Sequence, residues 1–147
     1  MRIGIRGRNL PGRRFSCADG PYENVHVAVQ SGTEPLGLVP GDSPSASWDI
    51  EVRVAIDDDG HLDFRGPVVH GKRGDRFIYL TWGEVADDPP FTMFRRAKLM
   101  LNRIDADLVR TAEKSDRPLI AAIDLTDDRG GPRCARVDPP ALSWALA

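Results

Sequence analysis

Alternation of apolar and charged residues between Trp48 and Asp57 is the feature that most constrains the fold of this chain. Apolar side chains occupy the even positions from 48 to 56, and acidic or basic residues occupy positions 49, 51, 53 and 57. A period of two predicts a β-strand with one buried face. The turn sequence Asp58-Asp59-Gly60 follows, and the alternation resumes at Leu62 and Phe64. We therefore predict a β-hairpin from Trp48 to Phe64.

Similar patterns elsewhere predict further strands, separated by segments rich in glycine, proline and aspartate. The nearly unbroken apolar run from Phe77 to Trp82 is typical of a strand that is covered on both faces, so we place it centrally in the sheet. The segments from Arg8 to Tyr22 and from Gly32 to Ser47 are predicted to be long loops. The other predicted strands cover residues 2–6, 25–29, 119–125 and 134–137.

One segment has the period of a helix. Thr92 is a suitable N-cap, and apolar residues then recur at spacings of three and four, which predicts an amphipathic helix. Asp105 either begins a second short helix that runs to about Lys114, or lies within a continuing helix. The apolar stripe comprises Phe94, Ala97, Leu101, Ile104 and Leu108.

These elements together predict an α+β fold. We expect a largely antiparallel sheet of about six to seven strands, sandwich- or barrel-like in shape, packed with one long or two short helices. A chain of 147 residues fits a single domain, 1–147.

The two halves of the chain, 1–60 and 61–147, share one short pattern. Ile5-Arg6-Gly7 is followed after four residues by Gly12-Arg13-Arg14, and Phe64-Arg65-Gly66 is followed after the same gap by Gly71-Lys72-Arg73. Either the halves are pseudo-repeats that place these basic loops beside one cleft, or the match is coincidental in a sequence rich in arginine and glycine.

Composition excludes several classes of protein. With 41% hydrophobic and 29% charged residues, a packed core is expected. The formal net charge of −2 argues against a nucleic-acid partner. No apolar run is long enough to span a membrane, and the first residues lack the apolar segment of a signal peptide. Two cysteines far apart, Cys17 and Cys134, fit a reducing compartment better than a disulfide framework, so we expect a cytoplasmic protein.

Sequence motifs give no support for catalysis or for a cofactor. The three histidines and two cysteines lack the spacing of a zinc site, and no phosphate-binding or nucleophile motif is present. We therefore expect no metal and no cofactor. His70 or Cys17, with a carboxylate partner, are the candidates for an enzymatic alternative.

Basic residues are the strongest candidates for a functional site, because arginine forks match the oxygens of carboxylates and phosphates. We predict that they bind an anionic small molecule, with an aromatic strand residue as an apolar wall. The alternative for the basic residues is a solvated face that is paired with local aspartates, and for the aromatic residues it is a place in the core. The predicted ligand-binding residues are Arg65, Lys72, Arg73, Arg76, Tyr79, Trp82, Arg95 and Arg96.

Several segments resemble a family of small, mainly actinobacterial proteins that is classed as a domain of unknown function. They are Gly7–Gly12, Val39–Asp42, Phe64–Pro67, Arg76–Gly83 and Met93–Leu99, of which the last two are the most specific. The resemblance covers most of the chain and implies a small stand-alone bacterial protein. It implies no activity, ligand or catalytic residue.

Three hypotheses of function follow from the sequence. The leading one is a non-enzymatic domain that binds a small anion or another small molecule through the basic cluster. The second is a protein-interaction or homo-oligomerising domain, with an exposed apolar patch near the loop from Pro35 to Pro44 or the tail from Pro139 to Trp144. The third is an enzyme that uses His70 or Cys17.

Overall fold

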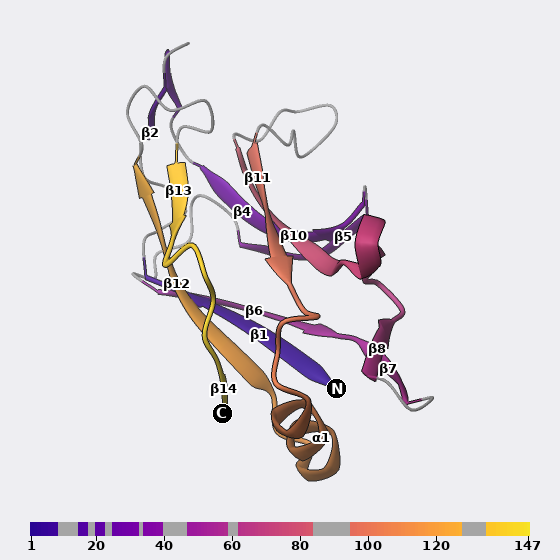
Figure 1. Ribbon diagram of the computed structural model, residues 1–147. Coiled ribbons are helices and arrows are strands. Elements are labelled where there is room, and N and C mark those ends of the chain that lie inside the picture. Colours follow the sequence, from indigo (N-terminus) through magenta and orange to yellow (C-terminus); the bar gives the residue numbers. More distant parts are fainter. Residues whose placement is uncertain are drawn as a thin grey trace.

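The computed structural model describes residues 1–8, 15–17, 20–22, 25–32, 34–39, 47–58, 62–83, 95–127 and 135–147. These residues form fourteen strands, one α-helix and one 3-10 turn, so the fold is mostly β and broadly α+β (Figure 1). The elements are β1 (Arg2–Gly7), β2 (Phe15–Cys17), β3 (Gly20–Tyr22), β4 (His26–Ser31), β5 (Glu34–Val39), β6 (Trp48–Arg53), β7 (Ala55–Asp58), β8 (Leu62–Arg65), β9 (Val69–His70), η1 (Lys72–Gly74), β10 (Arg76–Gly83), β11 (Arg95–Met100), α1 (Ala106–Ser115), β12 (Leu119–Asp127), β13 (Ala135–Asp138) and β14 (Trp144–Leu146).

The first main sheet has the order β13-β12-β1-β6, and β14 also pairs with β12. Its pairs are antiparallel except for β1 with β12, which are parallel, so these two strands end at the same edge of the sheet. The second main sheet has the order β11-β10-β4-β5, and β9 also pairs with β10. All its pairs are antiparallel. The expected antiparallel character is therefore confirmed, with one parallel pair as the exception.

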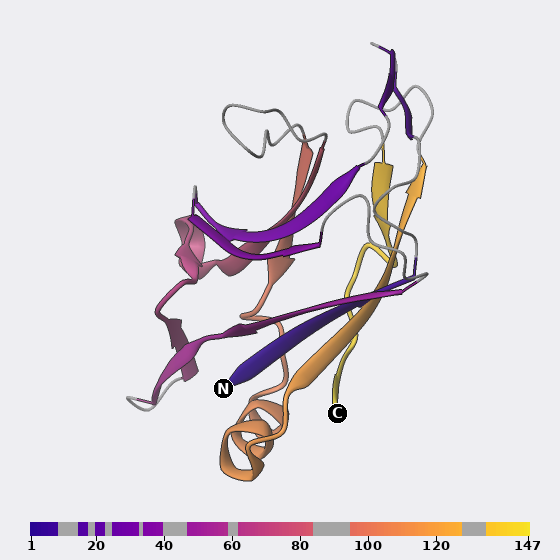
Figure 2. The same ribbon diagram turned by 180° about the vertical axis from the view of Figure 1, so that it is seen from behind.

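The two main sheets form separate layers that share one hydrophobic core (Figures 1 and 2). Within the described strands neither sheet closes on itself. Alternation in β6 buries Trp48, Ile50 and Val52 and leaves the charged residues between them exposed. The central position predicted for β10 is confirmed, because this strand lies between β11 on one side and β4 and β9 on the other. Core residues from β10 and its neighbours include Val27, Val29, Ile78, Leu80, Trp82 and Leu99.

The predicted helix from Thr92 is wrong where the structure can test it. Residues 92–94 lie outside the described part, and Arg95–Met100 is strand β11, paired with β10. The alternative of a continuing helix is also wrong, because the chain turns after Met100 and α1 begins separately. The short helix starting at Asp105 is confirmed: its carboxylate accepts a hydrogen bond from the Leu108 N–H at 3.0 Å, and α1 ends at Ser115. Helix α1 lies where β12 begins, near the N-terminus (Figure 1).

The predicted hairpin is shorter than expected. Only β7 and β8 pair with one another, whereas β6 pairs with β1. The predicted loops contain strands as well, since β2 and β3 lie between Arg8 and Tyr22, and β5 lies between Gly32 and Ser47. The estimate of six to seven strands was therefore too low. Each main sheet also contains strands from both halves of the chain, and whether the halves are pseudo-repeats stays a prediction.

No helix in the described ranges has the length and apolar character needed to cross a bilayer.

Candidate functional site

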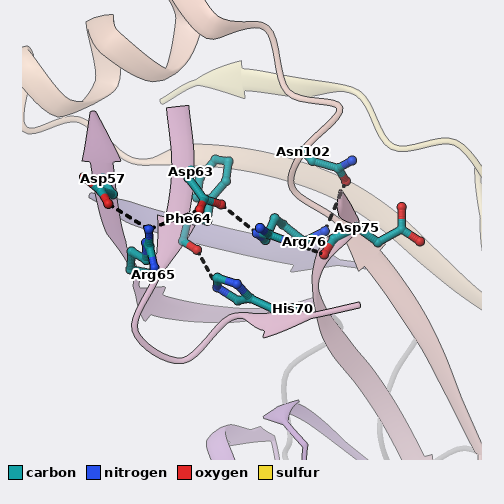
Figure 3. Close-up of polar contacts among 8 residues, drawn as sticks. All are labelled: Asp57, Asp63, Phe64, Arg65, His70, Asp75, Arg76 and Asn102. Carbon is teal, nitrogen blue, oxygen red and sulfur yellow. Dashed lines mark hydrogen bonds and ion pairs between the residues drawn. The ribbon is translucent and has the colours of Figure 1, made fainter. Parts of the chain in front are cut away.

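The predicted basic residues do not form one cluster in the folded chain. Arg65, His70 and Arg76 lie close together where the β7–β8 hairpin meets β9 and β10 (Figure 3). Lys72 and Arg73 are exposed in the turn η1. Arg95 and Arg96 lie on β11, several residues along the sheet from that turn. The residues that were predicted to form one basic site therefore lie in different parts of the molecule.

Carboxylates compensate the first group of bases. The Arg76 Nε donates to Asp63 Oδ1 at 2.6 Å. The second oxygen of Asp63 lies 3.5 Å from Arg65, which also forms an ion pair of 2.8 Å with Asp57. Figure 3 shows the guanidinium groups of Arg65 and Arg76 on either side of Asp63. Because carboxylates of the chain itself take these donors, Arg65 and Arg76 fit the alternative of a solvated face that is paired with local aspartates.

This arrangement lowers the pKa of Asp63. The hydrogen bond from Arg76 is the largest cause, and the positive charges of Arg76, Arg65 and His70 act in the same direction. Desolvation opposes them and raises the pKa, but the net shift is downward. The folded chain therefore favours the ionised form of this carboxyl group.

His70 has a structural partner. Its Nε2 lies 2.9 Å from the carbonyl oxygen of Phe64, which ties β9 to β8. In the described part of the chain no carboxylate makes a hydrogen bond to His70. The acid–base pair that the enzymatic alternative requires is therefore not seen at this residue. Cys17 lies in β2, and its side chain falls outside the described structure, as does Cys134.

Aromatic residues of β10 are divided between the two faces of the second sheet. Trp82 is 2% exposed and belongs to the core. Tyr79 lies on the opposite face, where the Arg96 guanidinium carbon is 4.4 Å from the ring centroid. Lys98 Nζ lies 4.6 Å from the centroid of Phe77 in the same way. The sheet thus brings Tyr79 and Arg96 together, as predicted for a site, and excludes Trp82 from it.

The two cation–π contacts follow the register of the strands. Tyr79 lies opposite Lys98, and Phe77 lies opposite Met100. Each cation therefore reaches diagonally to the next ring along β10, a distance that long side chains span readily. Among the described residues neither Arg96 nor Lys98 forms an ion pair with a carboxylate, in contrast to Arg65 and Arg76.

A small cavity lies beside this edge strand. Its volume is about 80 Å³, room for roughly two to three water molecules. Lys98 and Arg103 supply two cationic side chains, and Trp144 supplies an aromatic one. No acidic residue is among its described lining residues, which are Lys98, Met100, Arg103, Pro140, Ala141, Leu142 and Trp144.

The sequence places Lys98 among the basic candidates at the start of the predicted helix, but the predicted ligand-binding residues include neither Lys98 nor Arg103, which both lie off the apolar stripe of that helix. As a strand, residues 96, 98 and 100 share one face, whereas Leu99 is buried on the other. The alternation of Ala97, Leu99 and Leu101 with more polar residues is a signal that could have revealed this.

Metal ligands are not gathered at any of these places. In the parts of the chain that the structure covers, no three His, Cys, Asp or Glu side chains are placed to hold one ion. The interaction surface stays a prediction: Leu38, at 50%, is the single large hydrophobic residue exposed among the described residues, and it lies within the predicted segment from Pro35 to Pro44. The segment from Pro40 to Pro44 lies outside them.

Comparison with known proteins identifies the family and no activity. No curated protein and no solved structure matches the chain. A model for a family of unknown function, DUF5990, matches residues 1–147. The match spans the whole of the present sequence, so the chain belongs to this family of unknown function.

Proposed function

We propose that this protein is a non-enzymatic domain that binds a small anion, a phosphate or carboxylate group, in the cavity beside β11. The observation that carries the proposal is the convergence of Lys98 and Arg103 on one cavity that no described carboxylate lines. Two cations that line one cavity repel one another, and an anion between them relieves that repulsion.

The aromatic contacts support the proposal because they hold the cations without neutralising them. A ring face attracts a cation through its quadrupole and leaves the positive charge in place. The ammonium of Lys98 over Phe77 therefore keeps N–H donors for an oxyanion in the cavity. The guanidinium of Arg96 over Tyr79 is held in the same way outside the lining residues. This differs from the neighbourhood of Asp63, where both arginines already have carboxylate partners.

The size of the cavity supports a small ligand group. About 80 Å³ holds one phosphate or carboxylate and is far smaller than a typical drug-sized site. Trp144 lies in β14 and is partly buried against the core. Its ring adds an apolar wall for the apolar part of a ligand that bears the anionic group. Tyr79 and Arg96 extend the basic and aromatic surface along β10 and β11.

Titration with sodium phosphate and sodium acetate at constant ionic strength, followed by thermal unfolding, tests the proposal. A ligand at about 100 times its dissociation constant adds roughly 2.7 kcal/mol to the free energy of unfolding. We expect at least one of the two anions to raise the unfolding temperature, and we expect Lys98→Ala and Arg103→Ala to lose most of that increase. The anion that gives the larger increase identifies the ligand group.

Lys72→Ala is the matched control, because Lys72 is an exposed lysine in η1 without a described ion pair. It should respond to the anion as the unmodified protein does. A response that survives in Lys98→Ala and Arg103→Ala, or one that disappears in Lys72→Ala, would contradict the assignment of the site to this cavity.

A further inference from the structure

A second cavity, beside the first sheet where β1 ends, is lined by charges of both signs. Its volume is about 210 Å³. Arg8 lines it directly after β1, Asp124 lines it from within β12, and Asp138 lines it from the end of β13. Arg8 is held there by a hydrogen bond of 3.2 Å from its backbone N–H to the carbonyl of Ile123. Three adjacent strands thus each bring one charged residue to the same cavity.

The two aspartates are placed against an electrostatic preference. Asp124 and Asp138 are directly opposite one another in the antiparallel pair of β12 and β13. Like charges on directly opposite residues destabilise a sheet, because the Cβ atoms of the two residues are only about 5 Å apart. A ligand with a positive charge would convert this repulsion into attraction.

One oxygen of the two aspartates is buried and has no partner among the described residues. Asp124 Oδ1 is inaccessible to solvent, and no donor in the described ranges makes a hydrogen bond to it. Buried polar atoms are nearly always paired, and an unpaired one calls for a specific explanation. A donor bound at the Asp124 carboxylate would reach this oxygen after a rotation of the side chain.

Arg8 does not satisfy the aspartates, although it lines the same cavity. Within the described residues Arg8 forms no ion pair, and neither Asp124 nor Asp138 does. Elsewhere on this sheet the opposite charges do pair: Arg6 lies 3.0 Å from Asp49, and Arg2 lies 3.4 Å from Glu51. The cavity therefore lies between the cation of Arg8 and the carboxylates of Asp124 and Asp138, which form no ion pair across it.

We infer that this cavity binds a small zwitterion, an α-amino acid with a short side chain. The ammonium group lies between Asp124 and Asp138 and donates to their carboxylates, and the carboxylate of the ligand is bound by the guanidinium of Arg8. A volume of about 210 Å³ corresponds to roughly seven water molecules, which is near the size of such an amino acid. The site is independent of the Lys98 cavity, because the two share no lining residue.

Thermal unfolding and calorimetric titration of the full chain with L-alanine and L-serine test the inference. We expect both amino acids to stabilise the protein. N-acetyl-L-alanine lacks the ammonium group and L-alaninamide lacks the carboxylate, so each should bind roughly 10- to 100-fold more weakly, the loss of one charge-assisted contact.

Three variants separate a ligand site from a structural feature. Asp138→Asn removes the repulsion, so it should leave the unliganded protein at least as stable as before and weaken L-alanine binding by a similar ~10- to 100-fold. Arg8→Gln should weaken L-alanine in the same way and leave L-alaninamide unaffected. Arg6→Gln is the matched control, since Arg6 is an exposed arginine on β1, two residues before Arg8, but pairs with Asp49, and it should bind L-alanine normally.

Several results would overturn the inference. If neither amino acid stabilises the protein, or if L-alaninamide stabilises it as strongly as L-alanine, the site does not recognise a zwitterion. Stabilisation by magnesium chloride that is lost in Asp138→Asn would replace the amino acid with a divalent cation. A marked loss of stability in unliganded Asp138→Asn would show that the aspartates have a structural role.

Discussion

The Arg76 guanidinium donates from Nε to Asp63 Oδ1 at 2.6 Å and thereby joins the β7–β8 hairpin to the first residue of β10. Both side chains are partly exposed, at 20% and 28%. Arg76 also donates to the carbonyl of Asp75 at 2.9 Å, so its orientation is fixed from two sides. The hairpin has few other described contacts of this kind with the second sheet, which gives this pair a clear role in holding the two together.

Replacement of Asp63 by Asn should weaken the acid dependence of stability. A carboxyl group whose pKa is lowered by folding contributes stability above its unfolded-state pKa, and that contribution is lost as the pH falls through the folded-state pKa. Below about pH 5 the free energy of unfolding should therefore fall more steeply in the unmodified protein than in Asp63→Asn. Urea unfolding at a series of pH values measures the difference.

Arg76→Gln provides the companion measurement, because it removes the largest cause of the pKa shift and leaves the carboxyl group in place. Arg76→Gln should also reduce the dependence of the free energy of unfolding on acid pH. An unchanged slope in both variants would show that the contact is not maintained in solution.

Replacement of Gly7 by Ala should destabilise the first sheet. Gly7 lies opposite Trp48 in the pairing of β1 with β6, and a methyl group at position 7 would overlap the indole ring. Trp48 is 4% exposed and has little room to move. Such overpacking costs about 1–3 kcal/mol, which denaturant unfolding can measure.

Gly7→Ala should cost less when Trp48 is replaced by Leu, which makes room for the methyl group. The two substitutions would then be less than additive in a double-mutant cycle. Equal costs in both backgrounds would contradict a steric cause.

Replacement of Asp105 by Ala should destabilise the protein by about 1 kcal/mol, the usual loss for an N-cap. The Asp105 carboxylate accepts from the Leu108 N–H at 3.0 Å, and without it that donor at the start of α1 loses its protein partner. Thermal or urea unfolding measures the loss. Asp105→Ser keeps an N-cap oxygen and should retain most of the stability, so an equal loss in both variants would contradict the capping role.

Strand β11 shows why local patterns were misleading. Apolar residues at 94, 97, 101, 104 and 108 fit a helix, but Ala97, Leu99 and Leu101 fit a strand equally well. Strand β10 pairs with this segment through six residue pairs. This pairing selects the strand over the helix. Strand β5 was missed for another reason: Pro35 and Gly37 indicate a loop, yet an edge strand tolerates both.

The candidate site was predicted in part. Tyr79 and Arg96 do come together, and Arg65, His70 and Arg76 do cluster, but no sequence pattern indicated that Asp63 lies between the two arginines. Arg103 and Arg8 were not recognised, because their importance depends on residues near the C-terminus, Trp144 and Asp138.

The amino-acid sequence alone determined the local features: the alternating strand at Trp48–Arg53, the apolar strand β10 and the N-cap at Asp105. Each depends on residues a few positions apart, where periodicity and capping act directly. Only the tertiary structure decided that β1 pairs with both β6 and β12, and which of the described cations have carboxylate partners. Hydrogen-bond pairing and charge compensation depend on distances between residues far apart in the chain, and local patterns do not specify those distances.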